Sequence, residues 1–349
     1  MSGGVDSSVT AALLKEQGHQ VQGVFMAFGQ PQLDAQIERV QRIAARLALS
    51  LTVVDLREAF EQRVLAYFCR AYCRGLTPNP CVVCNRTIKC GELLARLRAR
   101  DSEISLATGH YARCVPDGAG PFELRRGRDA AKDQSYFLSQ LGQEQLTHLL
   151  FPLGDYTKKE VQQLAAVYGL QDLHSPESQD ICFLQESTVA AFLASHEPGL
   201  PGAGPIVSLA GRELGRHPGI HHFTVGQRRG LGLPDATPFY VVALESDGNR
   251  VVVGKRDDLL GRWLMVREPH WVAGLPPRLP QEFEVRIRHR HRAAPADVDW
   301  EQEGRLVITF REPQRAITPG QFAVLYHGDR VVGGGEIMPR PIRIRSDPA

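Results

Sequence analysis

The sequence lacks any run that approaches the roughly 20 uninterrupted apolar residues of a membrane-spanning helix. Its first residues also lack the basic, apolar and small-residue order of a secretory signal peptide. These two absences argue against a membrane partner and against secretion. We therefore expect a cytoplasmic protein.

An excess of one charge is missing as well. The chain has 41 Lys and Arg against 39 Asp and Glu, which gives a formal net charge of +2. A net charge this small does not indicate a nucleic-acid partner, because the electrostatic field of the whole protein would attract RNA only weakly. If the protein binds RNA, local basic patches must provide the contacts.

The sequence also lacks an even number of cysteines, which a framework of paired disulfides would need. Seven cysteines in a long chain argue against a secreted disulfide framework. In a reducing cytosol they suggest catalysis, metal binding or packing. The seven are Cys69, Cys73, Cys81, Cys84, Cys90, Cys114 and Cys182.

The sequence does contain enough apolar material for a sizeable core. Its 349 residues are 43% hydrophobic and 23% charged, which predicts two or three domains. Up to residue 154, short apolar runs alternate with amphipathic stretches, which is typical of an α/β domain with a doubly wound parallel sheet. The apolar runs are 21–26, 51–55 and 104–108, and the amphipathic stretches are 34–49, 57–74 and 86–100.

The pattern changes after residue 155. Helices predicted over 157–168 and 188–195 lead into a Gly/Pro-rich segment, 197–205, which we interpret as a linker. Strands separated by turn residues then predict a small antiparallel β-barrel. We expect three domains: 1–187, a small central domain at 188–237, and a C-terminal barrel at 238–349. The expected barrel strands are 240–244, 251–254, 283–289, 306–310, 322–326 and 331–337.

Residues 2–8 combine glycines, hydroxyls and one acid directly before an apolar-periodic helix. Glycine lets the backbone approach an anion, and the helix N-terminus adds partial positive charge. An N-capping serine after a flexible terminus is the simpler interpretation. The residue order, however, resembles the pyrophosphate loop of enzymes that cleave ATP to AMP and pyrophosphate, and it differs from the loop of gamma-phosphate-cleaving enzymes. The loop therefore predicts adenylation, with ATP phosphates held by Ser2, Gly3, Gly4, Val5, Asp6, Ser7 and Ser8.

The segment before this loop is shorter than expected. Such a loop normally follows a buried strand that aims its amides, and here only Met1 precedes Ser2. We interpret the first strand as missing, through a late start codon or a truncation, and expect weakened ATP binding and sheet stability. Adding about six apolar residues, a typical strand length, should then raise ATP affinity, and equal affinities would contradict the interpretation.

A Cys-x-x-Cys motif, Cys81 to Cys84, follows two prolines and precedes a helix expected near Arg86. The prolines should stiffen the loop, and a helix N-terminus close to Cys84 would lower its thiol pKa and favour the thiolate. Cys84 is therefore a candidate nucleophile. The motif alone is equally half a zinc site or a redox pair, but a partner Cys-x-x-Cys is absent, which makes a four-cysteine zinc site a poor interpretation.

An isolated cysteine, Cys182, lies about a hundred residues further on. A lone cysteine before Phe and Leu is more often a small buried hydrophobe than a catalyst. A sulfur-inserting enzyme, however, can carry a persulfide on one thiol and resolve it with another. Cys182 becomes a catalytic candidate in the company of Cys84. The other cysteines outside the Cys-x-x-Cys motif are interpreted as packing: Cys69, Cys73, Cys90 and Cys114.

Taken in order, the motifs resemble those of the tRNA-specific 2-thiouridylase family, whose members thiolate the wobble uridine of Lys, Glu and Gln tRNAs. The resemblance covers nearly the whole chain. In the first half it rests on residues 2–8, 23–26, 77–85, 109–113 and 132–138. Further along it rests on residues 151–154, 178–184, 222–232 and 318–321.

The resemblance implies a fold, cofactors and partners. The first domain would be like the adenine nucleotide alpha-hydrolases, followed by the small central domain and the barrel. ATP and Mg²⁺ would be the cofactors. The partners would be tRNA and a sulfur-donor protein, either a cysteine desulfurase or a sulfur-relay carrier.

Residue roles are implied at the matching positions. Met26 and Gly109 would contact the adenosine of ATP. Cys182 would receive the persulfide sulfur and Cys84 would be the nucleophile, which leaves a Cys84–Cys182 disulfide to be reduced. Asn79, Pro80 and Cys81 would meet the target base, and the other tRNA contacts would be His110, Lys132, Asp133, Gln134, Arg288, His289, Arg290 and Gln321.

One position departs from the family, since many relatives carry Asp where this chain has Cys81. The thiol is either a substitute for the carboxylate or a spectator. In a second possibility, Cys81, Cys84 and Cys182 ligate three irons of a [4Fe-4S] cluster whose fourth iron is open to sulfide. We rank the cluster below the persulfide route, and an iron and sulfide assay after anaerobic purification separates the two.

Basic residues gather in two places. Alternation along a strand would put Arg286, Arg288, Arg290 and Arg292 on one face, which suits RNA phosphates, although a solvated strand face is the simpler interpretation. A second candidate patch is formed by Arg125, Arg126, Arg128 and Lys132. The adjacent pair His221 and His222 is interpreted as part of a structural or RNA-facing loop, because neighbouring strand residues point to opposite sides and do not share a metal.

Two rival functions remain open. Another pyrophosphate-loop enzyme, such as an amide-forming synthetase, would need no paired cysteines, so loss of activity in Cys84→Ala separates it from a thiolase. A noncatalytic RNA-binding protein with a structural metal would release no AMP in response to tRNA.

Overall fold

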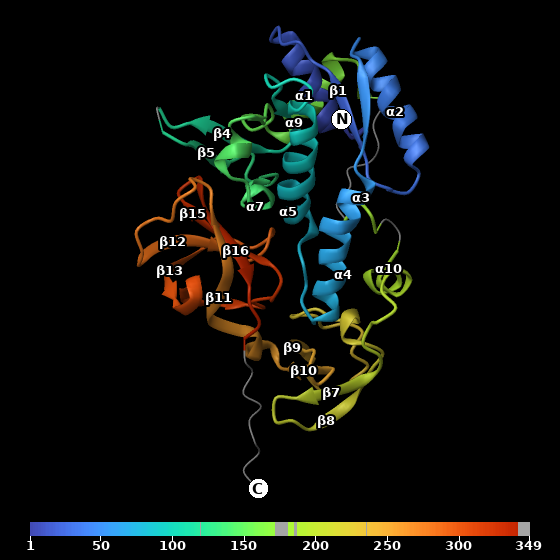
Figure 1. The fold of residues 1–349 in the computed structure, drawn as a ribbon. Helices are drawn as coiled ribbons and strands as arrows, with labels where there is room; N and C mark the ends of the chain where they lie inside the picture. Colours follow the sequence, from blue (N-terminus) through green and yellow to red (C-terminus); the bar gives the residue numbers. More distant parts are fainter. Residues whose placement is uncertain (119, 172–180, 185–186, 235, 341–349) are drawn as a thin grey trace.

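The computed structural model describes residues 1–118, 120–171, 181–184, 187–234 and 236–340. Figure 1 shows a helical N-terminal part at the top, a small sheet at the bottom and a barrel to one side. Helix α5 runs down the middle of this view and α4 lies below it, towards the small sheet. Within the described residues, every helix is too short or too polar to cross a bilayer.

The first elements form a small parallel α/β unit. Helix α1 buries a continuous stretch from Val9 to Leu14, in which all residues except Thr10 are apolar. The first two strands pair in parallel, with Gly23 opposite Leu51, and α2 covers them with Val40, Ile43 and Ala44. This pairing confirms the expected parallel strands. The elements are α1 (Val5–Glu16), β1 (Gly23–Ala27), α2 (Leu33–Arg46) and β2 (Leu51–Asp55).

Two longer helical runs follow, and both contain π-helical turns. One covers residues 57–73 and the other covers 80–98. The π-turns matter because their i→i+5 bonds change which side chains share a face. The first run is α3 (Arg57–Phe60), η1 (Glu61–Leu65) and α4 (Ala66–Cys73), and the second is α5 (Pro80–Cys84), η2 (Asn85–Leu93) and α6 (Leu94–Arg98).

A second parallel pair completes the N-terminal part. Leu106 of β3 lies opposite Leu149 of β6. Two helices that the sequence predicts from their caps are present: Thr157 accepts a hydrogen bond from the Glu160 amide, and Thr188 accepts one from the Ala191 amide. The elements are β3 (Leu106–Ala107), β4 (Ala112–Pro116), β5 (Phe122–Arg126), α7 (Ser135–Leu138), α8 (Gln143–Leu146), β6 (Leu149–Leu150), α9 (Lys158–Val167) and α10 (Val189–His196).

The small central sheet has the order β8-β7-β10-β9. Two of its strands, β9 and β10, were expected in the C-terminal barrel. That expectation is wrong, because Val251 of β10 pairs in parallel with Ile206 of β7 and buries its side chain in the central core. The elements are β7 (Gly204–Ser208), β8 (Glu213–His217), η4 (Ile220–His222), β9 (Tyr240–Glu245) and β10 (Arg250–Gly254).

The C-terminal strands close into an antiparallel barrel, as the sequence predicts. Their order is β11-β14-β13-β12-β15-β16, and pairing of β11 with β16 closes the ring. Strand β5 of the N-terminal part also pairs with β16, so a hairpin from one half extends the sheet of the other. The elements are η5 (Arg256–Leu259), β11 (Leu260–Trp271), β12 (Gln281–Arg286), β13 (Ala294–Glu301), η6 (Gln302–Gly304), β14 (Arg305–Arg315), β15 (Phe322–His327) and β16 (Arg330–Ile337).

Candidate active site

The loop at residues 2–8 leads directly into the first turn of α1. Gly4 is the N-cap, and its carbonyl oxygen accepts hydrogen bonds from the hydroxyls of Ser7 (3.1 Å) and Ser8 (2.9 Å). The Ser2 amide donates to the Ser7 hydroxyl at 3.1 Å, which folds the start of the chain back over the helix end. The first amides of a helix point outward and carry partial positive charge. The arrangement is suited to binding an anion such as a phosphate group.

A lysine that the sequence analysis did not single out lies beside this loop. The Lys158 ammonium donates to both carboxylate oxygens of Asp6, at 2.8 and 2.9 Å. The Tyr111 hydroxyl donates to the same carboxylate at 2.8 Å. Lys158 is the first residue of α9, and its cap Thr157 was the only sequence signal for its position. The structure thus adds a cation next to the expected phosphate site.

The two residues expected to contact adenosine lie near the carboxyl ends of parallel strands, where ligands bind in open α/β sheets. Gly109 follows β3 and touches the first turn of α1: a Cβ there would lie 2.9 Å from the Asp6 carbonyl carbon and the Ser7 nitrogen. Only glycine permits this approach. Met26, on β1, is half-buried against the same apolar cluster as Cys84.

The cysteine helix begins earlier than the sequence predicts. Its first residue is Pro80, and the Asn79 side chain caps it by accepting from the Val82 amide at 3.4 Å. Cys84 is therefore one turn inside the helix, away from the amino end where the dipole would favour a thiolate. Burial raises the pKa of Cys84 to about 12, and nearby Lys89 opposes the shift. The expected lowering of this pKa is wrong, and the thiol is neutral at pH 7.

Lys89 is the cation of the thiol cluster. Burial lowers its pKa, but charge interactions with Cys84, Cys81 and Cys182 outweigh burial and leave the pKa raised. An α-helical count from Cys84 points instead to Ile88, which is fully buried in the core. The π-helix η2 begins at the residue after Cys84, and its i→i+5 winding brings Lys89 to the side of the thiols. A helical wheel drawn from the sequence does not find this residue.

Cys182 comes to the same place from a distant part of the chain. It is exposed, while the next two residues, Phe183 and Leu184, are buried in the cluster against which Cys84 packs. Surrounding protein raises the pKa of Cys182, and Lys89 again opposes the shift, while Cys81 adds to it. All three cysteines are free thiols. The structure therefore brings Cys81, Cys84 and Cys182 together around one lysine.

The thiol cluster does not form a site for a single metal ion within the described residues, whereas the [4Fe-4S] alternative, in which each cysteine would bind a different iron, stays a prediction. Cys81, Cys84 and Cys182 all lie among the described residues, and no set of three His, Cys, Asp or Glu side chains there is placed to hold one metal. For Mg²⁺, Asp6 is the carboxylate at the phosphate loop, and Lys158 and Tyr111 already bind it. A magnesium ion would be held mainly by ATP phosphates, as is usual for this ion.

Two segments expected to contact tRNA meet in space although they are 153 residues apart. Asp133 is buried, and its carboxylate accepts from the Arg286 guanidinium at 2.7 Å and from the amides of Gly127 and Ser135. The His289 ring lies 3.3 Å from the Asp133 carbonyl oxygen. The 132–134 loop of the N-terminal part and the 288–290 turn of the barrel thus form one surface.

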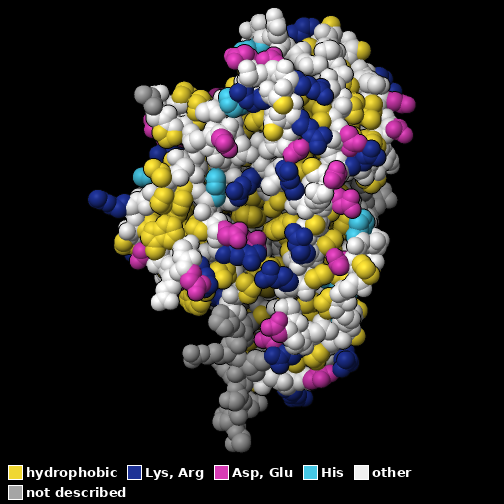
Figure 2. Space-filling model, viewed as in Figure 1, with side chains coloured by type: hydrophobic (Ala, Val, Ile, Leu, Met, Phe, Trp, Pro, Cys, Tyr) yellow, Lys and Arg dark blue, Asp and Glu magenta, His cyan; other side chains and the backbone are white. Residues whose placement is uncertain are grey.

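The expected row of four arginines on a strand is wrong. Strand β12 ends at Arg286, and the next residues form the turn to β13. Arg286 turns inward to Asp133, Arg288 is half-buried, and Arg290 and Arg292 are exposed in the turn. The second candidate patch is paired with acids: Arg125 with Glu123, Arg126 with Glu284 and Arg128 with Glu160. Figure 2 shows the same mixture, with Lys and Arg interspersed with Asp and Glu across the middle of the face.

His110 and Gln134 are held by neighbouring protein groups. The His110 Nδ1 lies 2.8 Å from the Thr108 hydroxyl, and burial together with Lys89 lowers its pKa to about 3, so the ring is neutral at pH 7. The Gln134 side chain accepts from the Tyr111 amide at 3.0 Å. His221 and His222 lie in the short helix η4 with ring centroids 4.5 Å apart.

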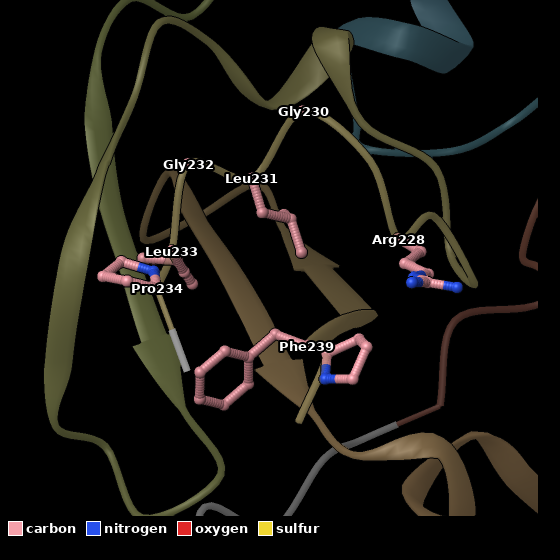
Figure 3. A pocket seen from close by; sticks show the side chains of 8 residues that line it. Arg228, Gly230, Leu231, Gly232, Leu233, Pro234 and Phe239 are labelled. Carbon is pink, nitrogen blue, oxygen red and sulfur yellow. The ribbon is translucent and has the colours of Figure 1, made fainter. Parts of the chain in front are cut away.

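Two cavities lie outside the thiol cluster. One, of about 380 Å³, belongs to the central domain and is lined by Leu231, Leu233 and Phe239, with Arg228 at its edge (Figure 3). The other, of about 520 Å³, lies between α4, the 197–199 segment and β11. Arg70, Arg74 and Arg267 line it, and Arg267 is paired with Glu336 at 2.6 Å.

Comparison with known proteins gives concordant matches along the chain. The family described as tRNA methyl transferase HUP domain matches residues 1–186, the tRNA methyl transferase PRC-barrel domain matches 190–255, and the aminomethyltransferase beta-barrel domain matches 262–337. The chain is 43% identical over 338 residues to the tRNA-specific 2-thiouridylase of Desulfotalea psychrophila, with 97% of each chain covered. It is 46% identical over 352 residues to the protein of the same name from Moorella thermoacetica, covering 97% of this chain and 98% of the relative. These matches agree with the α/β, central and barrel architecture described above.

Proposed function

This chain belongs to the tRNA-specific 2-thiouridylase family, and on that premise we propose that it adenylates a tRNA uridine and replaces its 2-oxygen with sulfur. The observation that carries the proposal is that Phe183 and Leu184, which follow Cys182, are buried in the cluster against which Cys84 packs, so that the charge of Lys89 acts on both thiols. A methyl transferase, which the family description names, needs no such pair of thiols. The thiols therefore favour thiolation.

The first step is activation of the base. The uridine 2-oxygen attacks the alpha-phosphorus of ATP, and pyrophosphate leaves into the amides of residues 2–8. Magnesium, bound mainly to the phosphates, offsets their charge. Lys158 supports this site by neutralising Asp6 beside the incoming anion. Asn79, Pro80 and Cys81 meet the uridine, which must leave the anticodon stack to reach them.

The second step is sulfur transfer. A persulfide on Cys182 attacks C2 of the adenylated uridine through its terminal sulfur. The Cys84 thiolate then attacks the Cys182 sulfur, which forms a Cys84–Cys182 disulfide and releases the sulfur on C2. Collapse to C=S expels AMP, which carries the original oxygen, and a thiol reductant restores both cysteines.

Lys89 supplies positive charge where two sulfur anions form in turn. Its ammonium acts on Cys182 and Cys84. Charge placed in advance at a developing anion is a common source of catalysis. The persulfide comes from a sulfur-donor protein, either a cysteine desulfurase or a relay carrier, and the exposure of Cys182 suits such a transfer between proteins.

The remaining contacts with tRNA belong to the surface where the two halves meet. We propose His110, Lys132, Gln134, Arg288, His289 and Arg290 as these contacts. Asp133, whose buried carboxylate binds Arg286, holds the 132–134 loop in place and does not itself face RNA. We also propose that the domain boundary after the central sheet falls between β10 and β11, and not at residue 237, because β9 and β10 belong to the central sheet.

The test is mass spectrometry of tRNA nucleosides after incubation with ATP and a sulfur source. We expect 2-thiouridine with the unmodified protein and its loss in Cys182→Ser, with tRNA binding retained. Thiolation by Cys182→Ser would contradict the role of this thiol. AMP release that does not depend on tRNA would point to a different pyrophosphate-loop enzyme.

A further inference from the structure

The π-helix that carries Lys89 has two main-chain carbonyls bound by a side chain from outside the helix. The Gln145 side-chain amide donates to the carbonyl oxygens of Arg86 at 2.8 Å and of Cys90 at 2.9 Å. Both carbonyls belong to η2. A primary amide has two N–H donors, so one glutamine can bind two carbonyl oxygens at once. Gln145 therefore connects two positions of η2 that lie four residues apart.

The other end of the Gln145 side chain is bound as well. Its Oε1 oxygen accepts from the Gly142 amide at 3.2 Å, at the start of α8, the short helix on which Gln145 itself lies. Because α8 fixes the oxygen of the side chain, the nitrogen keeps a fixed direction towards η2. Gln145 is therefore a bridge between α8 and η2.

A glycine in the same part of η2 makes room for the Arg86 carbonyl. A Cβ added at Gly91 would lie 2.7 Å from the Arg86 carbonyl oxygen and 4.0 Å from the Gln145 Nε2. The first distance is shorter than van der Waals contact allows, so any other side chain would displace this carbonyl. Gly91 and Gln145 thus serve the same group: one leaves space for the Arg86 carbonyl oxygen, and the other donates to it.

The winding of η2 decides which side chain faces the thiols. An amide bonds to the carbonyl four residues earlier in an α-helix and five residues earlier in a π-helix. Because π-turns are rare, one that persists needs a local cause, and a side chain that inserts into the ladder of main-chain bonds is such a cause. If residues 85–93 rewound to an α-helix, Ile88 and not Lys89 would lie one turn after Cys84.

We infer that Gln145 is a positioning residue, which holds η2 in its π-helical winding and thereby holds Lys89 beside the cysteine thiols. Its effect on sulfur transfer rests on the proposed function, whereas its effect on the thiols rests on the geometry of η2. Gln145 acts through the backbone of η2 and then through the charge of Lys89. It is thus a part of the site that belongs to neither the cysteine motifs nor the phosphate loop.

The experiment compares Gln145→Met with Gln143→Met, because methionine keeps the length of the side chain and removes the donor. Gln143 lies on the same helix, and both ends of its side chain are also bound. Its Oε1 accepts from the Phe122 amide at 2.8 Å, and its Nε2 donates to the carbonyl oxygens of Phe122 at 2.9 Å and Val272 at 2.7 Å. These partners lie outside η2, which makes Gln143→Met a matched control. The alkylation rate of Cys84 is measured by peptide mass spectrometry from about pH 7 to 10, and the free energy of unfolding by denaturant titration.

For Gln145→Met we expect the alkylation rate of Cys84 to fall by about threefold to tenfold, because a cation that moves away by a few ångströms stabilises the thiolate less. Lys89→Met should act in the same direction. The double variant should fall no further than Lys89→Met alone, since both changes act through one charge. Gln143→Met should lower the free energy of unfolding and leave the alkylation rate unchanged. The kcat for tRNA thiolation should fall in Gln145→Met by a factor comparable to that of alkylation.

Gly91→Ala acts on the same carbonyl by direct contact, and the alkylation rate of Cys84 should fall in this variant too. Three results would overturn the inference: an unchanged rate in Gln145→Met, an equal fall in Gln143→Met, or a double variant whose fall is the product of the two single falls. If Gln145→Met does not fold, Gly91→Ala takes its place in the same comparison. A protein that makes no 2-thiouridine contradicts the proposed function, whereas the alkylation rates still test the role of Gln145.

Discussion

The Cys84 thiol is neutral at pH 7, because burial raises its pKa to about 12. A nucleophile in this state depends on whatever positive charge lies near it, since the thiolate is the reactive form. Lys89 is the cation that acts on Cys81, Cys84 and Cys182 alike. At the residue scale, two opposing effects on the Cys84 pKa therefore set the reactivity of the site: burial raises the pKa, and the Lys89 ammonium lowers it.

This balance predicts a pH profile. Because the pKa of Cys84 lies above the accessible range, its thiolate fraction and its alkylation rate should rise about tenfold per pH unit from pH 7 to 10, without a plateau. Lys89→Met removes the opposing charge, so the rate should fall at every pH. Arg86→Met, an exposed cation of the same helical run, is the control and should leave the profile unchanged. A plateau near pH 8 in the unmodified protein would show that burial does not dominate.

Lys158 gives a second prediction at this scale. Its ammonium binds Asp6 at the phosphate loop, and Lys158→Met would leave the Asp6 charge facing the phosphates of ATP. We expect ATP affinity, measured by calorimetry, to fall by about tenfold or more, since each tenfold corresponds to about 1.4 kcal/mol. The adjacent Lys159 is exposed, and Lys159→Met should bind ATP as the unmodified protein does. Equal affinities for the two variants would remove Lys158 from the site.

Helix α5 is the element that carries the chemistry, and its start is defined by one side chain. Asn79 caps the helix and Pro80 occupies the first helical position, which is the favoured combination for a helix start. The helix continues into η2, whose π-winding brings Lys89 to the thiols. The position of the cap therefore sets the position of both Cys84 and its cation.

Removal of this cap should have a local chemical effect. Asn79→Ala should lower the free energy of unfolding by about 1 kcal/mol and change the Cys84 alkylation rate. Thr188→Ala removes the matched cap of α10, where Thr188 accepts from the Ala191 amide at 3.2 Å. It should cost a similar free energy in denaturant titration without altering Cys84. A similar effect of both variants on Cys84 would mean that general destabilisation, and not the helix start, controls the thiol.

The whole molecule is held at two places where distant parts of the chain meet. At one, Thr77 contacts the barrel through Pro319, and its hydroxyl lies 3.4 Å from that of Thr224 in the central part. At the other, Arg286 of the barrel binds the buried Asp133 of the N-terminal part. These contacts fix the position of the barrel relative to the N-terminal part, and so the position of the expected RNA surface relative to the thiol cluster.

The Arg286–Asp133 pair gives a prediction at the scale of the molecule. Its side chains are 13% and 5% exposed, so Arg286→Met would leave a buried carboxylate without its partner and should cost about 3–5 kcal/mol of unfolding free energy. Arg311→Met breaks an ion pair with Glu282 in which both side chains are more than half exposed, and it should cost less than about 1 kcal/mol. Denaturant titration measures both. A small loss for Arg286→Met would show that the two halves do not depend on this contact.

Local sequence determined the elements and the chemical types of the site. Caps at Thr157 and Thr188, the glycines before α1 and the short apolar run of β15 are short-range patterns, and the helices and the strand formed where these patterns lie. Motif order was enough to indicate the family. The pairing of Cys84 with Cys182 was an implication of that family and not of any spacing in the chain.

Tertiary structure alone decided which side chains act on one another. The pKa of Cys84 follows from burial among residues far away in sequence, and Lys89 is found only when the π-helical winding is known. Strands β9 and β10 belong to the central sheet because β10 pairs with β7 and β9 pairs with β10. The pattern of residues within a strand does not show which other strand it pairs with. Gln321 and Asp133 look like free polar residues in the sequence, yet each is used by a segment more than 150 residues away. Local patterns specify backbone conformation and residue chemistry, whereas desolvation and long-range contact depend on how the whole chain packs.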